Sequence, residues 1–433
     1  MKRTILAFVA AAVSMAALAV GPSGMYHYSV SLTNYISTET GKAPTAYLWI
    51  PENCKKVKAV MLAQQNMAEE ALYRMESFRK EMEEMDVALL WVAPWFSQKW
   101  DPATSCQSTF DDMMTAIAYQ SGHMEIAHSP VIPFGHSAQA TFPWNFAAWN
   151  PDRTLCIISF HGDAPRTNLC GFGTANVEWG RTRNIDGIPG LMIEGEYEWW
   201  EARVRPALAF RMMYPESCIS FLCDTEGGHF ECLPETARYI ALFIRKSMEK
   251  RLGADGKLRQ LNPHDGWLAA RWQPEGKRPA AAPFARYKGD PHDAFWYFDS
   301  EMAHLTEQRY AASRGKREQT VGIEFEGKQV DLDPNRHGGI VADFRPTQNE
   351  PDIFHVRAVH MGKRHSSGPL HTEVICGPVD KVDDTTFRIR PYECGMDNPR
   401  RSFTVWLVAI AEGDSTFKRA VQPIEIRLPQ TGR

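Results

Sequence analysis

Between residues 26 and 252 the chain alternates short apolar runs with longer stretches in which apolar residues recur every three or four positions. A short continuous apolar run is typical of a strand buried on both faces, and the wider spacing is typical of an amphipathic helix. Strands are predicted at 28–32, 46–50, 57–63, 87–93, 131–134, 155–160, 188–193 and 218–222, and helices at 69–85, 110–121, 138–149, 201–213 and 234–251. This alternation predicts the α/β class, with a mostly parallel sheet covered by helices on both sides.

The pattern changes after residue 252. Residues 253–283 are rich in Pro, Gly, Lys and Arg and are interpreted as a linker, and a helix is predicted at 294–314. Strand-like runs follow at 320–325, 354–358, 372–376, 387–391, 403–409 and 424–428, which predicts a small antiparallel, immunoglobulin-like sandwich. We therefore expect a targeting segment at 1–19, an α/β domain at 20–252, a linker and packing helix at 253–315 and a β-rich domain at 316–433. The α/β domain is expected to fold without the β-rich one.

The first residues have the order of an export signal. Met1, Lys2 and Arg3 form a charged start, an apolar stretch follows, and residues 17–19 read Ala-Leu-Ala, a small-x-small cleavage pattern. The apolar stretch is short for a membrane anchor, and no basic cluster follows it. We expect a periplasmic protein that is soluble once the signal is cleaved.

Net charge and cysteine content restrict the classes of function that the protein can have. The net charge is −4 with both signs interspersed, which excludes the basic footprint of a nucleic-acid-binding protein. The nine cysteines are an odd number, so at least one is unpaired within the chain; Cys376 with Cys394, or a pair among Cys218, Cys223 and Cys232, could form a disulfide. No Cys or His spacing typical of structural zinc occurs, and we expect neither a metal nor an organic cofactor.

A candidate nucleophile lies between a predicted strand and a predicted helix. Residues 133–140 read Pro-Phe-Gly-His-Ser-Ala-Gln-Ala, which places Ser137 at a strand–turn–helix junction. Such a junction raises the hydroxyl above the end of the strand, where a substrate can approach it. Gln139 stands where the common Gly-x-Ser-x-Gly pattern has its second glycine. The alternative is a serine in an ordinary turn.

A nucleophilic serine needs a base, and the base needs an orienting acid, which follow in the chain order Ser, acid, His in this arrangement. Acidic residues follow the predicted strand 188–193, in Glu194-Gly195-Glu196-Tyr197-Glu198, and Glu198 is the first choice with Glu196 second. His229 lies in a Gly-Gly loop after the predicted strand 218–222 and is the candidate base. The alternatives are a solvated acidic loop and a surface histidine.

Two backbone N–H groups are expected to stabilise an oxyanion. One belongs to Ala138, the residue after the serine. The second should follow the predicted strand 57–63, where Asn66 is favoured and Met67 fits the spacing equally.

With these three motifs the chain resembles the α/β-hydrolase superfamily over roughly residues 26–252. The Gly-His-Ser-Ala-Gln wording and the two-domain arrangement more narrowly resemble exported carbohydrate esterases of Bacteroides-type gut bacteria, similar to pectin or rhamnogalacturonan-II methylesterases. This resemblance implies a Ser-His-Glu acyl-enzyme mechanism on methyl esters of galacturonic acid in pectin. It also implies a supporting or glycan-positioning role for the second domain.

Residues of the types that contact saccharides accompany these motifs. Aromatic rings stack on sugars and arginines pair with uronate carboxylates, and the candidates are Trp95, Trp199, Arg166, Arg181 and Arg203. The expected partner is a polysaccharide or oligosaccharide ester. An acetyl esterase acting on xylan, an exported serine peptidase and a catalytically silent glycan-binding scaffold remain open alternatives, and the oligomeric state is open as well.

Overall fold

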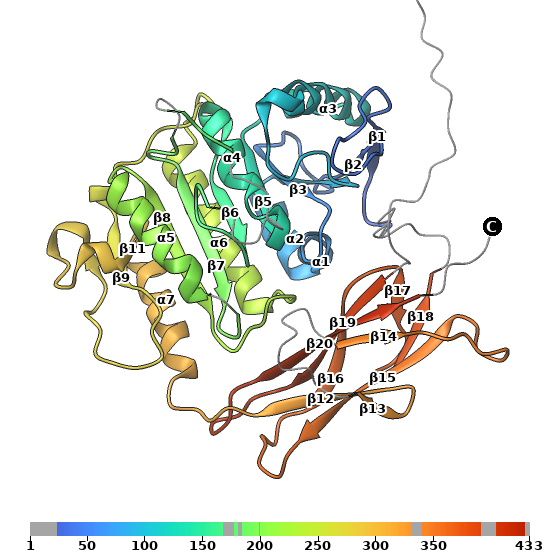
Figure 1. Cartoon of the computed structure of the whole chain (residues 1–433). Helices are drawn as coiled ribbons and strands as arrows, with labels where there is room; N and C mark the ends of the chain where they lie inside the picture. Colours follow the sequence, from blue (N-terminus) through green and yellow to red (C-terminus); the bar gives the residue numbers. More distant parts are fainter. Residues whose placement is uncertain are drawn as a thin grey trace, which may run out of the picture.

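An eight-stranded sheet is the centre of the first domain (Figure 1). The computed structural model describes residues 24–167, 177–180, 184–198, 200–330, 340–390 and 404–428. The sheet has the strand order β1-β2-β4-β3-β5-β6-β7-β8. Its strands are β1 (Tyr28–Ser31), β2 (Thr45–Trp49), β3 (Ala59–Gln64), β4 (Val87–Ala93), β5 (Val131–His136), β6 (Ile157–Phe160), β7 (Pro189–Gly195) and β8 (Cys218–Asp224). The predicted targeting segment, Arg181, Trp199 and Cys394 lie outside the described residues.

Only β2 runs against the rest of the sheet. It pairs antiparallel with β1 and with β4, whereas every pair from β4 to β8 is parallel. A mostly parallel sheet is therefore confirmed. The strand order and the single antiparallel strand give the chain the α/β-hydrolase fold.

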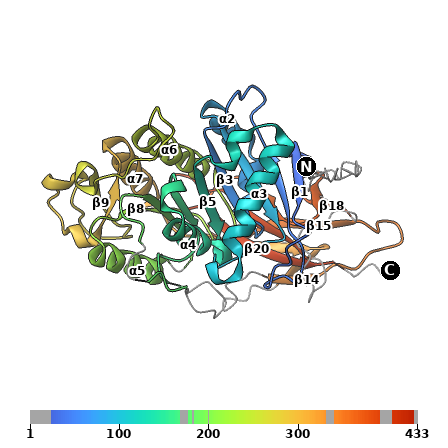
Figure 2. The same cartoon turned by 90° about the horizontal axis from the view of Figure 1, so that it is seen from above.

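Helices cover both faces of this sheet, as the view from above shows (Figure 2). They are α1 (Glu69–Arg74), α2 (Glu76–Glu84), α3 (Cys106–Ser121), α4 (Phe142–Trp149), α5 (Trp200–Met213) and α6 (Pro234–Arg251). Successive residues of β3 enter different apolar clusters: Val60 and Leu62 pack in one, and Met61 and Ala63 in the other. Side chains alternate across a strand, so a strand buried on both faces must be apolar at every position. The short 3₁₀ helices within this domain are η1 (Pro102–Thr104), η2 (Met124–Ala127), η3 (Ser137–Gln139) and η4 (Pro151–Arg153).

The segment predicted as a linker and packing helix, residues 253–315, contains ordered elements that pack against the central sheet. Its elements are η5 (Pro263–Asp265), β9 (Trp267–Ala270), β10 (Ala282–Pro283), η6 (Phe284–Arg286), η7 (Pro291–Asp293), β11 (Ala294–Tyr297) and α7 (Ser300–Ser313). Trp272, Tyr297 and Tyr310 are buried in the same apolar cluster as the central sheet. The element list is therefore not complete at Arg251, and a chain cut after residue 252 would expose part of this core.

The second domain has two sheets around an apolar core of its own. One sheet has the order β13-β12-β15-β18-β17 and the other β14-β20-β19-β16. The strands are β12 (Thr320–Phe325), β13 (Lys328–Val330), β14 (Ile340–Asp343), β15 (Ile353–Met361), β16 (Leu370–Cys376), β17 (Val379–Lys381), β18 (Thr386–Ile389), β19 (Thr404–Ala411) and β20 (Ala420–Arg427). β14 pairs parallel with β20, which departs from the purely antiparallel sandwich that the sequence predicts. The immunoglobulin-like topology stays a prediction.

Two further expectations concern cysteines and membranes. The thiols of Cys54, Cys106, Cys156, Cys218, Cys223, Cys232 and Cys376 are free. The pairs considered among Cys218, Cys223 and Cys232 are therefore not formed. Among the described residues, no helix has the length and apolar character needed to cross a bilayer.

Candidate active site

Ser137 occupies a sharp turn at the carboxyl end of β5. Its backbone φ is +53°, a left-handed conformation that costs energy for any residue with a Cβ. The turn is also crowded, because a Cβ on Gly135 would lie 2.0 Å from the Gln139 carbonyl oxygen and one on Gly162 would lie 1.9 Å from the Ala140 Cβ. The glycines that this turn needs are thus Gly135 and Gly162, which allows Gln139 where the common pattern has glycine.

Ser137, His229 and Glu198 form one hydrogen-bonded chain. The Ser137 Oγ lies 2.8 Å from the His229 Nε2, and the His229 Nδ1 lies 2.5 Å from the Glu198 Oε2. Because a carboxylate only accepts hydrogen bonds, Nδ1 carries the proton and Nε2 accepts the proton of the serine. The three residues follow β5, β7 and β8, whose carboxyl ends meet at one edge of the sheet.

Each of the three candidate acids has a different neighbour. Glu194 lies buried at the end of β7 and binds the Arg203 Nη1 at 2.7 Å. Glu196 binds the Lys418 Nζ at 2.8 Å. Glu198 alone reaches His229 among the three, because the turn after Gly195 brings its Oε1 back to the Gly195 N–H at 2.5 Å.

Opposing influences set the pKa values of the acid and the base. Burial by itself raises the pKa of Glu198, but the facing His161 and His229 outweigh burial and hold it well below its usual range. Burial lowers the pKa of His229 below 6.5, and the Glu198 carboxylate only partly opposes this effect. The carboxylate is therefore charged and the imidazole neutral at neutral pH, which is the state a serine–base pair requires.

This lowered pKa predicts the pH dependence of turnover. His229 must be neutral to accept the serine proton, so the acid limb of kcat/KM for a neutral ester should be centred below the ordinary histidine pKa of 6.5. The measurement is a pH–rate profile from mildly acidic to mildly alkaline buffer. A Glu198→Gln variant should shift the acid limb to still lower pH, because it lacks the charge that raises the base's pKa. An acid limb centred at or above 6.5 in the unmodified protein would contradict the assignment.

Two buried histidines that the sequence analysis did not assign support this chain. His161 follows β6, has a φ of +51°, and donates its Nδ1–H to the Glu198 Oε1. His136 precedes the serine and donates its Nε2–H to the His229 carbonyl at 2.7 Å. The signal for His161 was present, because it follows a parallel strand whose carboxyl end meets the same edge as β5 and β7.

Arg203 completes the surroundings of the acid. Its Nη1 lies 3.0 Å from the Glu198 Oε2, and its side chain is only 4% exposed. It also forms an ion pair with Glu194, so its positive charge is balanced by buried carboxylates of the protein itself. Arg203 is thus placed to orient the acid, and its predicted contact with substrate stays a prediction.

The expected oxyanion donors lie on two segments that are tied to the nucleophile turn. The Asn66 Nδ2 donates to the His136 carbonyl at 2.7 Å, and the Gln98 Nε2 donates to the Ala138 carbonyl at 2.6 Å. The Glu69 Oε1 accepts the backbone N–H of His136 at 2.7 Å, and burial raises the pKa of this carboxyl to about 8. The segment after β3 is therefore held beside the turn. The roles of the Ala138 and Asn66 N–H groups stay predictions.

The remaining substrate candidates lie around this edge. Trp95 is partly exposed and donates its indole N–H to Glu39 at 2.8 Å. Arg166 is also partly exposed, binds the Tyr214 hydroxyl at 2.5 Å and the Glu178 carboxylate at 3.2 Å, and lies over the Trp179 ring. Their contact with a substrate stays a prediction.

The acid and the two histidines around it form a cluster of the residue types that bind metal ions. His161, Glu198 and His229 offer ligand atoms within 4.8 Å of one another, and their mutual hydrogen bonds account for this proximity. A cavity of about 580 Å³ lies between the domains, and its lining includes residues 231–234 and parts of β16, β17 and β19. The serine and the base are not among its lining residues.

Comparisons with known proteins give weak likenesses to solved structures. No family model matches the chain, and no curated protein matches it significantly. An S-formylglutathione hydrolase from Staphylococcus aureus is 13% identical with a TM-score of 0.35, over 51% of this chain and 97% of that one. A substrate-bound, fluorophosphonate-binding serine hydrolase from the same organism is 14% identical (TM-score 0.37, 51% and 97%), and a dienelactone hydrolase from Anabaena variabilis is 14% identical (TM-score 0.31, 54% and 98%).

These likenesses are too weak to establish the fold by themselves, and they do not support the narrower resemblance to carbohydrate esterases. The fold is assigned instead from the strand order of the sheet and from the left-handed backbone conformation of Ser137 at the carboxyl end of β5. On that evidence the first domain has the α/β-hydrolase fold.

Proposed function

We propose that this chain is a serine hydrolase that cleaves carboxylic esters through an acyl-enzyme. The hydrogen-bonded chain from Ser137 through His229 to Glu198 carries this proposal, because it combines a raised hydroxyl, a neutral base and a charged acid. A serine in an ordinary turn would need none of these partners.

The proposed reaction has two matching halves. His229 takes the proton of Ser137 as Oγ attacks the ester carbonyl, and Glu198 stabilises the imidazolium that forms. The Ala138 N–H and the Asn66 N–H stabilise the oxyanion, and the imidazolium then protonates the departing alcohol. Water, activated by the same histidine, attacks the acyl-enzyme and releases the acid.

We further propose that the protein is exported and acts on a plant polysaccharide. The proposed substrate is the methyl ester of galacturonic acid in pectin. Trp95 supports a saccharide, since it lies on the segment whose Gln98 contacts the nucleophile turn. Arg166 supports an acidic sugar, because its guanidinium is a partly exposed cation on the segment that follows His161. The charged, apolar and small-residue order of the first 19 residues supports export to the periplasm.

A release assay tests the substrate. Purified protein is incubated with methyl-esterified pectin and with acetylated xylan, while methanol and acetate are quantified. We expect methanol from pectin, little acetate from xylan, and neither product with Ser137→Ala. Acetate release without methanol would replace the pectin proposal by a deacetylase. Absence of turnover on both polymers and on p-nitrophenyl acetate would contradict the esterase proposal itself.

A further inference from the structure

The two loops that carry Glu198 and His229 form a single unit. We name residues 196–198 the acid loop and residues 225–231 the base loop. The Tyr197 N–H of the acid loop donates to the Gly227 carbonyl of the base loop at 3.1 Å, and the Glu196 N–H donates to the carbonyl of Asp224, the last residue of β8, at 3.0 Å. The whole base loop lies outside helices and strands, so contacts from elsewhere must help to set its position.

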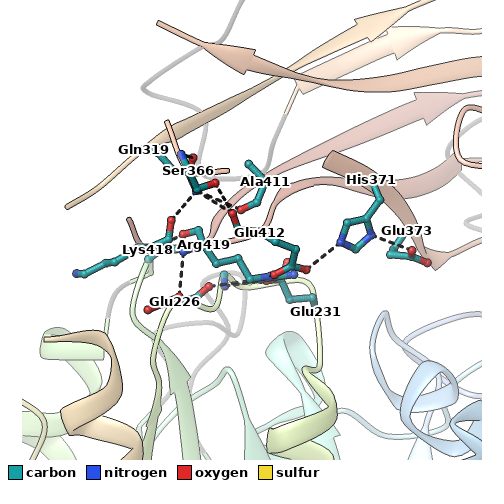
Figure 3. A network of polar contacts seen from close by, with 12 residues as sticks. Glu226, Glu231, Gln319, Ser366, His371, Glu373, Ala411, Glu412, Lys418 and Arg419 are labelled. Atoms are coloured by element: carbon teal, nitrogen blue, oxygen red, sulfur yellow. Dashed lines mark hydrogen bonds and ion pairs between the residues drawn. The ribbon is translucent and has the colours of Figure 1, made fainter. Parts of the chain in front are cut away.

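The hairpin between β19 and β20 supplies such contacts from the second domain. We name residues 412–419 the β19–β20 hairpin. The Lys418 Nζ binds Glu196 at 2.8 Å, and the Tyr197 hydroxyl donates to the Arg419 carbonyl at 2.5 Å. The Arg419 backbone N–H donates to the Glu226 Oε2 at 2.9 Å, and its guanidinium pairs with Glu231 (Figure 3). The hairpin therefore contacts the chain next to the acid and on both sides of the base.

These ion pairs are shielded from water. The side chains of Lys418 and Glu196 are 12% and 8% exposed, and those of Arg419 and Glu231 are 8% and 9% exposed. Removing one partner of a buried pair leaves an unpaired charge in a poorly solvated place. The loop must then move to solvate that charge.

An apolar contact continues the same connection. The Phe230 ring meets the His229 ring edge-on at a centroid distance of 4.8 Å and stacks on Trp406 of β19 at 4.9 Å. Phe230 is buried in a small cluster with Ile375, Val408 and Ile410. A Cβ on Gly228 would lie 2.9 Å from a methyl group of Val421, so the base loop has little room to shift toward β20.

The hairpin is itself held firmly by its own domain. The Gln319 side-chain amide donates to the Lys418 carbonyl at 2.7 Å and to the Glu412 carbonyl at 3.2 Å (Figure 3). Within the hairpin, Asp414 accepts the N–H groups of Thr416 and Phe417 at 2.7 and 2.8 Å. A firm support is what a positioning contact requires.

We propose that the β19–β20 hairpin is a positioning element of the active site, in which Lys418 and Arg419 hold the acid and base loops so that Glu198, His229 and Ser137 stay in line. The inference rests on the proposed function and goes beyond it by giving the second domain a part in turnover. It differs from glycan positioning, because it affects substrates too small to reach the second domain.

The test measures kcat and KM of full-length Lys418→Met and Arg419→Met on p-nitrophenyl acetate. Each substitution keeps much of the side chain's length and removes the charge. We expect kcat to fall about tenfold or more with KM nearly unchanged, because small misplacements of reacting groups cost large factors in rate. Arg419→Lys, which keeps the charge, should recover part of the loss.

Arg357→Met is the matched control. Arg357 pairs with Glu324 at 2.5 Å on an exposed part of the same domain, with its side chain 61% exposed. This variant should keep the unmodified kcat. Thermal unfolding of every variant separates misplacement of the loops from global unfolding. If Arg419→Met does not fold, the single variants Lys418→Met and Arg419→Lys provide the test.

A second readout does not depend on turnover. The proton shared by the His229 Nδ1 and Glu198 should give a downfield NMR resonance in the unmodified protein, which weakens in Lys418→Met and Arg419→Met but not in Arg357→Met. Unchanged kcat and an unchanged resonance in the hairpin variants would overturn the inference, as would an equal loss in Arg357→Met. Failure of the proposed function is distinct, because the unmodified protein would then not turn over the ester at all.

Discussion

Ser137→Ala should lower kcat on p-nitrophenyl acetate by about a million-fold, since loss of the nucleophile removes the acyl-enzyme route entirely. The fold should persist, because alanine accepts the same backbone conformation at no more cost than serine and the turn is held by its neighbours. The measurement is steady-state hydrolysis beside the thermal unfolding midpoint.

Ser108→Ala is the matched control for this substitution. Ser108 is an exposed serine on α3 whose hydroxyl donates to the carbonyl of Ser105, the N-cap residue of the same helix, so its loss should leave kcat unchanged. Turnover within tenfold of the unmodified protein in Ser137→Ala would show that another group attacks the ester.

Glu198→Gln should lower kcat by about ten-thousand-fold, the size of effect seen when the orienting acid of a serine–histidine pair becomes an amide. Glu198 accepts hydrogen bonds from His161, His229, Arg203 and the Gly195 N–H, and a glutamine amide cannot accept at its nitrogen end. The base then loses both its tautomer control and the charge that stabilises the imidazolium. Steady-state kinetics on the same ester measures the loss.

Glu196→Gln and Glu194→Gln serve as comparisons for this prediction. Glu196 pairs with Lys418, so we expect a loss of about tenfold through the loop positions. Glu194 pairs with Arg203 below the acid, and we expect a loss smaller than that of Glu198→Gln by orders of magnitude. Near-normal turnover in Glu198→Gln with collapse in Glu196→Gln would move the acid two residues back along the chain.

Apolar run length explains which elements the sequence predicted well. The run 87–93 and the helix 234–251 have the predicted bounds in the structure, because a fully buried strand and an amphipathic helix leave unambiguous patterns. The predicted helix 294–314 was wrong at its start, where Ala294–Tyr297 pairs with β9 as a strand. Its aromatic residues pack against the main sheet, which only the tertiary structure reveals.

Chain order explains which site residues could be found. Ser137, Glu198 and His229 each follow a predicted strand, so their meeting at one edge of the sheet follows from topology. Choosing Glu198 over Glu196 depended on the turn after Gly195, which the sequence indicates through its glycine.

Other partners of the site have no local signal. The ion pair between Arg203 and Glu198 could not be predicted, because a helix sequence does not show which residue faces a buried carboxylate. Lys418 meets Glu196 from 222 residues away, and no periodicity or spacing reports such a contact. The sequence of residues 253–283, rich in Pro, Gly, Lys and Arg, likewise does not show that Trp272 is buried against the main sheet.

Covalent labelling tests the central claim most directly, namely that His229 activates Ser137 as a nucleophile. Full-length protein is treated with an alkyl fluorophosphonate, which reacts with activated serines, and the adduct is mapped by peptide mass spectrometry. We predict one adduct, on Ser137, which is absent in Ser137→Ala and forms far more slowly in His229→Ala. Ester turnover without labelling of Ser137, or labelling that is unaffected by loss of His229, would contradict the account.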